Sequence, residues 1–251
     1  MMLLSLRDLS VTRRSRKVVQ GISLDITPGE FIGLIGPNGA GKTSLLRAAL
    51  GLLAHEGHSS LAMLPPGRRA RMAAFLPQGR QIAWPVTVER LVALGRIPHG
   101  AAPGDAAAID RAITALGLDE MRHRPATQLS GGEQARALIA RAMAQETPLL
   151  VADEPIAGLD PAAQIAAMRV FAARAAAGGA VIASLHDLGL AARHCSRLIL
   201  LDRGRIVAEG PPAEVLTPDH IGRVFGISAH FADTAQGPVF QPLDLLPARA
   251  P

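Results

Sequence analysis

The chain has 251 residues, of which 49% are hydrophobic, and it carries a formal net charge of +5. A chain of this length can bury one sizeable core, and its apolar runs fall well short of the roughly 20 residues that cross a membrane as a helix, so we expect no membrane-spanning helix. The single cysteine, Cys195, excludes a disulfide within the chain and suits a reducing compartment. Met1–Leu9 has no basic region followed by a long apolar stretch, so we expect no secretory signal.

The first third of the chain predicts strands that lead into a glycine-rich loop and a helix. Alternating apolar residues favour two early strands, with a polar turn around residues 13–17 between them. Phe31–Ile35 is an apolar run of buried-strand length that precedes the glycine-rich loop. For the segment 55–66 the sequence does not decide which residues form strands. We expect strands over residues 3–11, 22–26, 31–35 and 74–76, and helices over residues 43–50 and 68–74.

From about residue 87 to residue 128 the pattern changes to helices broken by Gly95, Pro98 and Gly104. This change predicts an inserted helical subdomain that ends in a longer helix. Strands alternate with helices again beyond it, which favours a largely parallel sheet. We expect helices over residues 132–144, 162–176, 188–194, 214–216 and 221–225, strands over residues 149–152 and 180–185, and a hairpin of residues 198–201 and 205–209.

These elements predict an α/β fold that is organised around one nucleotide-binding unit. We expect residues 1–86 and 146–243 to form its core, and residues 87–145 to form the helical subdomain. The residues 244–251 have little pattern, and we expect a loose tail there.

The glycine-rich loop after Phe31–Ile35 fits the pattern G-x-x-x-x-G-K-[ST]. Glycines let backbone N–H groups turn toward phosphate oxygens, Lys42 would reach the β- and γ-phosphates, and the hydroxyl of Thr43 would bind Mg²⁺. The helix that starts there adds its positive N-terminal end. We therefore expect an ATP site made of Gly36, Pro37, Asn38, Gly39, Ala40, Gly41, Lys42, Thr43 and Ser44.

The run Leu129–Gln134 places a serine and two glycines at the start of a helix. Ser130 is a candidate N-cap with Glu133 three positions later, so an ordinary helix start is one interpretation. The glycines also leave bare N–H groups at a helix N-terminus, which can bind an anion. This run resembles the signature sequence of the ABC ATPase family. The resemblance implies that Ser130, Gly131, Gly132 and Glu133 contact the γ-phosphate held by a second copy of the chain.

Further motifs follow in the order found in that family, along nearly the whole chain. Leu149–Pro155 resembles the Walker B strand, which implies that Asp153 holds Mg²⁺ and that Glu154 acts as general base on the attacking water. An apolar strand would deliver both carboxylates to its carboxyl end, where ligands bind in open α/β sheets. The resemblance also implies a P-loop NTPase fold with a RecA-like core, mostly parallel sheet, N-terminal antiparallel β subdomain and inserted α-helical subdomain.

Three shorter motifs complete the resemblance. Gly158–Asp160 resembles the D-loop, so Asp160 is expected at the dimer interface. Gln78 resembles the Q-loop glutamine, a contact for metal and water at the border of the helical subdomain. His186 resembles the switch histidine that bonds the γ-phosphate, although an isolated histidine is more often structural. The implied catalytic set is Glu154, His186 and Gln78, and the implied Mg²⁺ set is Thr43, Gln78 and Asp153.

The chain departs from the family pattern at the position that would contact the adenine base. Many members carry an aromatic residue near the N-terminus that stacks on adenine, and this chain has no tyrosine and places Arg13 there. Arg13 or Arg16 could stack through its guanidinium plane. The alternatives are a weakly held adenine or a solvated turn. Ile156 replaces the usual threonine or serine after the Walker B proline, which places no catalytic role in doubt.

The stretch Val86–His99 resembles the helical-subdomain segment of type II importers for iron–siderophore, haem and cobalamin. That resemblance implies an ATPase dimer at the cytoplasmic face of the inner membrane, bound to two membrane-spanning permease subunits that receive ligand from a substrate-binding protein. A permease helix would lodge near residues 78–84, where Trp84 is either a contact or a core aromatic. The rival hypotheses are a soluble ABC ATPase acting on nucleic acid or ribosomes, and a non-hydrolysing scaffold. The absence of a basic tail and zinc-binding cysteines opposes the first, so no nucleic acid partner is expected, and Glu154 with His186 opposes the second.

Overall fold

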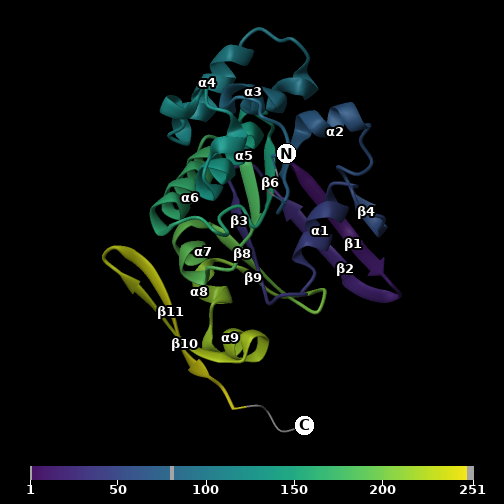
Figure 1. The fold of residues 1–251 in the computed structure, drawn as a ribbon. Helices are drawn as coiled ribbons and strands as arrows, with labels where there is room; N and C mark the ends of the chain where they lie inside the picture. The colour runs from purple at the N-terminus through teal and green to yellow at the C-terminus, as the bar shows by residue number, and fades with distance from the viewer. Residues whose placement is uncertain (1, 80–81, 248–251) are drawn as a thin grey trace.

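The computed structural model describes residues 2–79 and 82–247. A central sheet runs through it in the strand order β5-β6-β7-β3-β8-β9 (Figure 1). Neighbouring strands from β5 to β8 are parallel, and β9 returns antiparallel to β8. The predicted parallel sheet and its terminal hairpin are therefore confirmed. The strands are β5 (Ala73–Leu76), β6 (Leu149–Asp153), β7 (Ala180–Ser184), β3 (Phe31–Ile35), β8 (Arg197–Asp202) and β9 (Arg205–Gly210).

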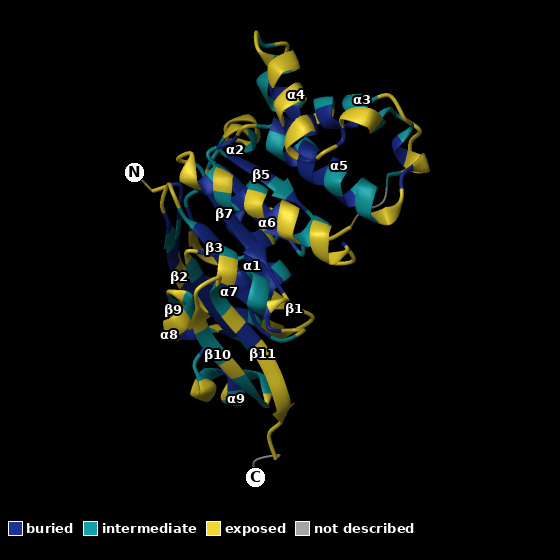
Figure 2. Cartoon of the chain, turned by 90° about the vertical axis from the view of Figure 1, so that its left-hand side faces the viewer, coloured by how far each residue is buried: buried dark blue, intermediate teal, exposed yellow. Residues whose placement is uncertain are grey.

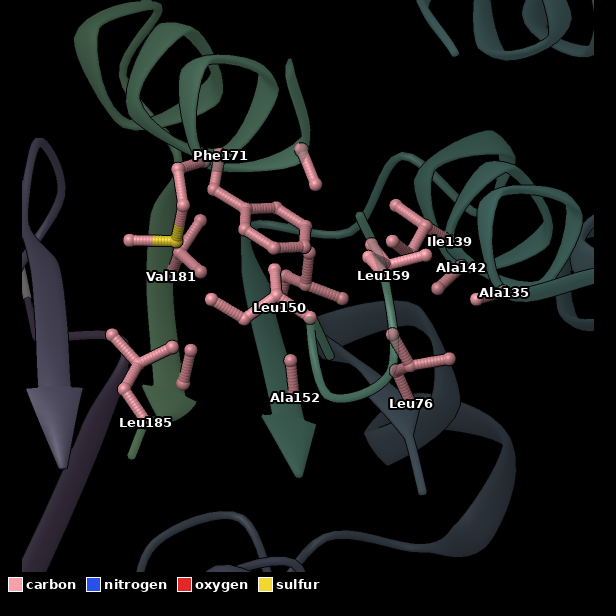
Figure 3. Close-up of a cluster of buried hydrophobic side chains, with 14 of the residues drawn as sticks. Leu76, Ala135, Ile139, Ala142, Leu150, Ala152, Leu159, Phe171, Val181 and Leu185 are labelled. Carbon is pink, nitrogen blue, oxygen red and sulfur yellow. The ribbon is translucent and has the colours of Figure 1, made fainter. Parts of the chain in front are cut away.

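The inner strands are apolar throughout because both faces of the sheet are covered. Every residue of β3, β6 and β7 is buried, and successive residues alternate between two cores, since strand side chains point to opposite faces. Leu150 of β6 and Val181 of β7 belong to the core on the helix-side face of the sheet, which is the face that Phe171 covers; Figure 3 shows both residues beside Phe171. Leu149 and Ile182 join the core on the other face. The dark-blue strands between exposed outer layers in Figure 2 show the same arrangement.

The face opposite Phe171 is covered by helix α1 (Lys42–Ala49) and an antiparallel sheet in the order β2-β1-β4. Its strands are β1 (Leu4–Arg13), β2 (Arg16–Ile26) and β4 (Glu56–Ser59). The expected antiparallel subdomain is present, and the segment left open at 55–66 supplies β4. The turn is shorter than expected: only Arg14 and Ser15 lie between the strands, both with positive φ.

The helix-side face carries the inserted subdomain and the later helices. Phe171 of α6 meets Phe31 edge to face, with ring centroids 6.0 Å apart. In η1, Gly95 lies against the backbone of Arg141 so closely that a Cβ would collide with its carbonyl oxygen. The helical segments here are α3 (Val88–Ala93), η1 (Leu94–His99), α4 (Asp105–Ala115), η2 (Asp119–Met121), η3 (Ala126–Gln128), α5 (Gly131–Ala144), α6 (Pro161–Ala176), α7 (Leu188–His194), α8 (Pro212–Val215) and α9 (Pro218–Phe225). Helix α2 (Pro66–Met72) instead packs Met72 against the core of the opposite face.

A C-terminal hairpin of β10 (Ile227–Thr234) and β11 (Gly237–Leu245) was not predicted from the sequence. It packs on α7, where Arg193 donates to the carbonyl oxygen of Gln236 at 2.7 Å (Figure 1). Strand β11 runs to Leu245 and takes in the first two residues of the segment expected to be loose, while residues 248–251 lie outside the described part. Among residues 2–79 and 82–247, no helix has the length and apolar character needed to cross a membrane.

Candidate nucleotide-binding site

The loop between β3 and α1 is shaped by glycines in conformations that other residues avoid. Gly36, Gly39 and Gly41 have φ of 146°, 79° and 106°, where L side chains are strained. A Cβ at Gly36 would collide with the carbonyl oxygen of Leu201, and a Cβ at Gly41 would collide with that of Val18. The loop is therefore wedged between β2 and the end of β8, and its backbone is fixed before any ligand binds.

Lys42 begins α1 and folds back over this loop. Its Nζ donates to the carbonyl oxygens of Gly36 at 2.7 Å and Pro37 at 3.1 Å. Burial holds the pKa of Lys42 below its ordinary value, and the nearby carboxylates of Glu154 and Asp153 oppose that shift. A cavity of about 220 Å³ opens over the loop, lined by Arg13, Val18, Asn38, Gly39, Ala40, Gly41, Lys42, Thr43, Ser44 and Glu154. The structure thus brings a mostly buried ammonium and a row of backbone N–H groups to one small cavity.

Asp153 ends β6 and is 1% exposed. Its Oδ1 accepts hydrogen bonds from the hydroxyls of Thr43 at 3.1 Å and Ser184 at 2.8 Å. Its Oδ2 is buried and has no hydrogen-bond partner among the described residues. A buried carboxylate oxygen without a donor is costly unless a cation or water satisfies it. The Thr43 hydroxyl and this oxygen therefore suit a divalent cation.

Glu154 follows Asp153 with a φ of 51°, in the left-handed region, which costs a non-glycine residue about 1–2 kcal/mol. This turn brings its carboxylate to two other predicted residues. Oε1 lies 2.8 Å from Nε2 of His186, and Oε2 accepts from Nε2 of Gln78 at 3.0 Å. Because an ionised carboxylate only accepts, the proton of His186 in this contact sits on Nε2. Gln78, Glu154 and His186 follow β5, β6 and β7, so the sheet order makes them neighbours.

The signature turn lies away from this cavity. Ser130 caps α5: its hydroxyl accepts from the N–H of Glu133 at 3.3 Å, and Glu133 accepts from the N–H of Ser130 at 2.7 Å. The backbone hydrogen bond from Ser130 holds the pKa of Glu133 below its usual range. A separate cavity of about 550 Å³ is lined by Ser130, Gly132, Glu133 and Asp160, among others. Among the described residues, the cavity over the phosphate loop is lined by none of these.

The structure bears on two further predictions, the adenine contact at Arg13 or Arg16 and the place of Trp84. Arg13 lines the phosphate-loop cavity, whereas Arg16 is not among its described lining residues. Trp84 is 74% exposed, so the interpretation as a core aromatic is wrong. Ser184, which forms hydrogen bonds with both Asp153 and Glu154, was not predicted from the sequence. The available signal was a hydroxyl residue at the carboxyl end of an apolar strand, two positions before His186.

The glycine-rich loop, the lysine that folds back over it and the carboxylates at the end of β6 define a P-loop nucleoside triphosphatase. Comparisons with known proteins narrow this class. The family model described as ABC transporter matches residues 19–157. The chain belongs to the ABC transporter family, as one of its ATP-binding subunits that hydrolyse ATP.

Relatives in that family match over most of the chain. The hemin import ATP-binding protein HmuV of Nocardia farcinica is 40% identical over 258 residues, covering 97% of this chain and 88% of the relative. The HmuV of Rhodococcus jostii is 38% identical, covering 96% and 85%. The cobalamin import ATP-binding protein BtuD of Halobacterium salinarum is 38% identical, covering 89% and 59%.

Solved structures agree in fold. A metal-chelate type ABC transporter in an inward-facing conformation matches with a TM-score of 0.83 and 24% identity, covering 98% of both chains. The ATP-binding subunit of an ABC transporter matches with a TM-score of 0.75 and 27% identity, covering 89% of this chain and 93% of that chain. The expected α/β P-loop NTPase fold is confirmed.

Proposed function

We propose that the chain is the ATPase subunit of an importer that takes up a haem, cobalamin or iron–siderophore ligand. The observation that carries this proposal is the match over 97% of the chain to a protein named for hemin import. Two copies would dock on two membrane-spanning permease subunits at the cytoplasmic face of the inner membrane. A substrate-binding protein would deliver the ligand from outside, so the ligand itself would not touch this chain.

The phosphate loop would hold the triphosphate of ATP. The ammonium group of Lys42 donates hydrogen bonds to the carbonyl oxygens of Gly36 and Pro37. These oxygens are weaker acceptors than phosphate oxygens. On binding, Lys42 would turn from these carbonyls to the β- and γ-phosphates. The backbone N–H groups of Asn38, Gly39 and residues 41–44 would donate to the same phosphates, together with the N-terminal end of α1, whereas the N–H of Ala40 already donates to Pro37 at 3.2 Å. No reshaping of the loop is required, because packing already fixes its glycines.

The residues present fit Mg²⁺. This ion takes oxygen ligands and usually combines one or two protein oxygens with phosphates and water. Oδ2 of Asp153 and the hydroxyl of Thr43 are such oxygens, and the described residues hold no cluster of three or more His, Cys, Asp or Glu side chains that would form a cage. When bound, Mg²⁺ would neutralise charge on the phosphates. Gln78 would join it through its amide oxygen, since its nitrogen donates to Glu154.

Glu154 would act as the general base that orients and deprotonates the attacking water. Its carboxylate is 18% exposed and is gripped by Gln78 and His186 from two sides. A γ-phosphate would compete with Glu154 for the Nε2 proton of His186. That exchange would break the contact between Oε1 of Glu154 and His186 at the moment the phosphate is in place. The two histidine contacts thus link base activation to nucleotide binding.

One chain does not hold a complete site by this mechanism. Ser130, Gly132 and Glu133 line a different cavity from the phosphate loop, together with Asp160, and Gly131 lies in the same first turn of α5. We place them against the γ-phosphate bound by a second copy, in an ATP-sandwich dimer with the D-loop at the interface. Each of the two sites would then need both chains.

Arg13 would contact the adenine base in place of an aromatic residue. It lines the cavity beside Val18, next to the phosphate loop. A guanidinium plane can stack on a base but reads no particular edge of it. Arg13→Tyr should therefore tighten ATP binding, and a variant with unchanged affinity would remove Arg13 from the base contact.

The permease would dock beside the helical subdomain near residues 78–84. Trp84, with 74% of its surface exposed, is an anchor of the kind that interfaces favour. Arg80 and Gln81 of the same stretch lie outside the described residues. Closure of the dimer would move this surface and so move the permease.

The deciding experiment measures ATPase activity of the chain alone and with its permease in liposomes, with binding proteins loaded with haem, cobalamin or a siderophore. Stimulation by one loaded binding protein supports the importer and names the ligand. Activity that ignores the permease and responds to DNA or ribosomes would instead indicate the soluble class. Glu154→Gln in the same assay reports whether the stimulated activity comes from this site.

A further inference from the structure

Ser184 ends β7 directly beside the end of β6. It pairs in register with Asp153 across the two parallel strands, and it is 0% exposed. A buried hydroxyl must find partners within the protein. Those it finds are the two consecutive acidic residues of the proposed hydrolytic site, at 2.8 Å each.

The direction of both hydrogen bonds is fixed by chemistry. The backbone N–H of Glu154 can only donate, so the Ser184 oxygen accepts it. Oδ1 of Asp153 can only accept when ionised, so the single hydroxyl proton goes there. The hydroxyl therefore has one arrangement, and no rotation of Ser184 satisfies both partners in another way.

The bond to Asp153 decides which carboxylate oxygen remains for a cation. Oδ1 is engaged by two hydroxyls, those of Ser184 and Thr43. Oδ2 is buried without a partner in the described part of the chain. Without the Ser184 proton, the carboxylate could turn and share its oxygens differently with Thr43, and Oδ2 would lose its defined place.

The bond to Glu154 holds a strained turn. Glu154 adopts a φ of 51°, which a non-glycine residue keeps only where the surroundings hold it. Its N–H is anchored on the Ser184 oxygen, and this turn directs the carboxylate to Gln78 and His186. One hydroxyl thus sets both the cation ligand and the base.

We propose that Ser184 is a positioning residue for Mg²⁺-dependent ATP hydrolysis, acting through Asp153 and Glu154. This rests on the proposed roles of Asp153 as metal ligand and Glu154 as base. Residues that orient metal ligands typically contribute about 10–100-fold to metal affinity or activity. Ser184→Ala should raise the Mg²⁺ concentration for half-maximal turnover and lower kcat, each by roughly 10-fold or more, while ATP binding in EDTA stays within about 2-fold of wild type.

The test compares variants at fixed saturating ATP over a series of Mg²⁺ concentrations. Ser59→Ala is the matched control, because Ser59 is also buried and its hydroxyl donates to Ala49 at 2.6 Å, away from the site. Its Mg²⁺ dependence should be that of wild type even where its stability falls. Ser184→Thr keeps the hydroxyl and should recover most of the lost Mg²⁺ response.

The outcomes are distinguishable. Ser184→Ala with wild-type Mg²⁺ dependence and kcat, beside an Asp153→Asn enzyme that loses both, overturns the role of Ser184 and leaves the metal site standing. An Asp153→Asn enzyme with unchanged Mg²⁺ dependence overturns the metal assignment and the role of Ser184 with it. A folded Ser184→Thr enzyme as impaired as Ser184→Ala also overturns the proposal, because the hydroxyl would then not be the cause.

Discussion

Two turns of this chain carry glycines at the start of a helix, but the structure constrains the two sets of glycines differently. In the phosphate loop, Gly36 and Gly41 have positive φ and lie against carbonyl oxygens of β8 and β2. In the signature turn, a Cβ at Gly131 would meet nothing within 4 Å, and one at Gly132 would reach only Leu159 at 3.8 Å. Neither of these two has the positive φ that only glycine tolerates well.

The contrast separates glycines that packing within the chain requires from glycines that only a bound ligand or a partner chain would require. Packing within the chain accounts for Gly36 and Gly41, whatever binds later. It does not account for Gly131 or Gly132, which sit in the first turn of α5, where alanine is the better helix former. An account of the signature glycines therefore has to come from outside the single chain, as the dimer proposal supplies.

The largest expected effect lies on the phosphate-loop side and leaves its packing intact. Glu154→Gln keeps the size and hydrogen-bonding shape of the side chain but removes the basic carboxylate. Turnover should fall about 10²–10⁴-fold, with ATP affinity within a few-fold of wild type. Single-turnover hydrolysis and equilibrium ATP binding measure the two separately. Normal turnover in this variant would take Glu154 out of the base role.

The phosphate-loop glycines should fail as structural residues. Gly41→Ala forces a Cβ onto the carbonyl oxygen of Val18 at a φ of 106°, so the free energy of unfolding should drop by about 2–4 kcal/mol. ATP binding should be lost together with stability. Denaturant unfolding and nucleotide titration check both. Wild-type stability would show that β2 gives way easily, and the contrast between the two turns would then weaken.

The signature glycines should fail in the opposite manner. Gly132→Ala should leave stability unchanged or raise it by about 0.4–1 kcal/mol. Under the dimer proposal it should also lower turnover about 10-fold or more, because the added methyl group would crowd the N–H groups that would donate to phosphate. Gly67→Ala is the matched control, since Gly67 lies in α2 with open space around it; its turnover should not change. Full activity in Gly132→Ala would argue that the turn is only a helix start.

Much of the fold follows from local pattern, and the failures have a physical cause. Apolar runs predicted β3, β6 and β7 because both faces of the sheet are buried. The hairpin of β10 and β11 escaped prediction because Pro238 and Pro242 oppose a strand assignment, and because its stability comes from packing of Phe240 against α7, far away in sequence. Local sequence carries no trace of such a contact.

The site residues also divide into those that local sequence predicts and those that only the sheet order brings together. The phosphate loop is one continuous segment, so its spacing alone predicted its residues. The meeting of Glu154 with Gln78 and His186 joins residues 76 and 32 positions apart, and it depends on the sheet order. Family resemblance grouped these three, but Ser184 belonged to no motif. Only the register of β6 against β7 revealed its contacts.

The smallest expected effect tests whether the signature serine is more than a helix cap. Ser130→Ala removes the cap of α5 and should lower the free energy of unfolding by about 1 kcal/mol. Thr217 caps α9 in the same geometry, accepting from the N–H of His220 at 3.3 Å, so Thr217→Ala should have a similar cost. If Ser130 also contacts a phosphate across a dimer, turnover should fall only in Ser130→Ala, by more than its stability loss explains. Equal turnover in the two variants would reduce Ser130 to a cap, because both would have lost the same hydrogen bond with the same result.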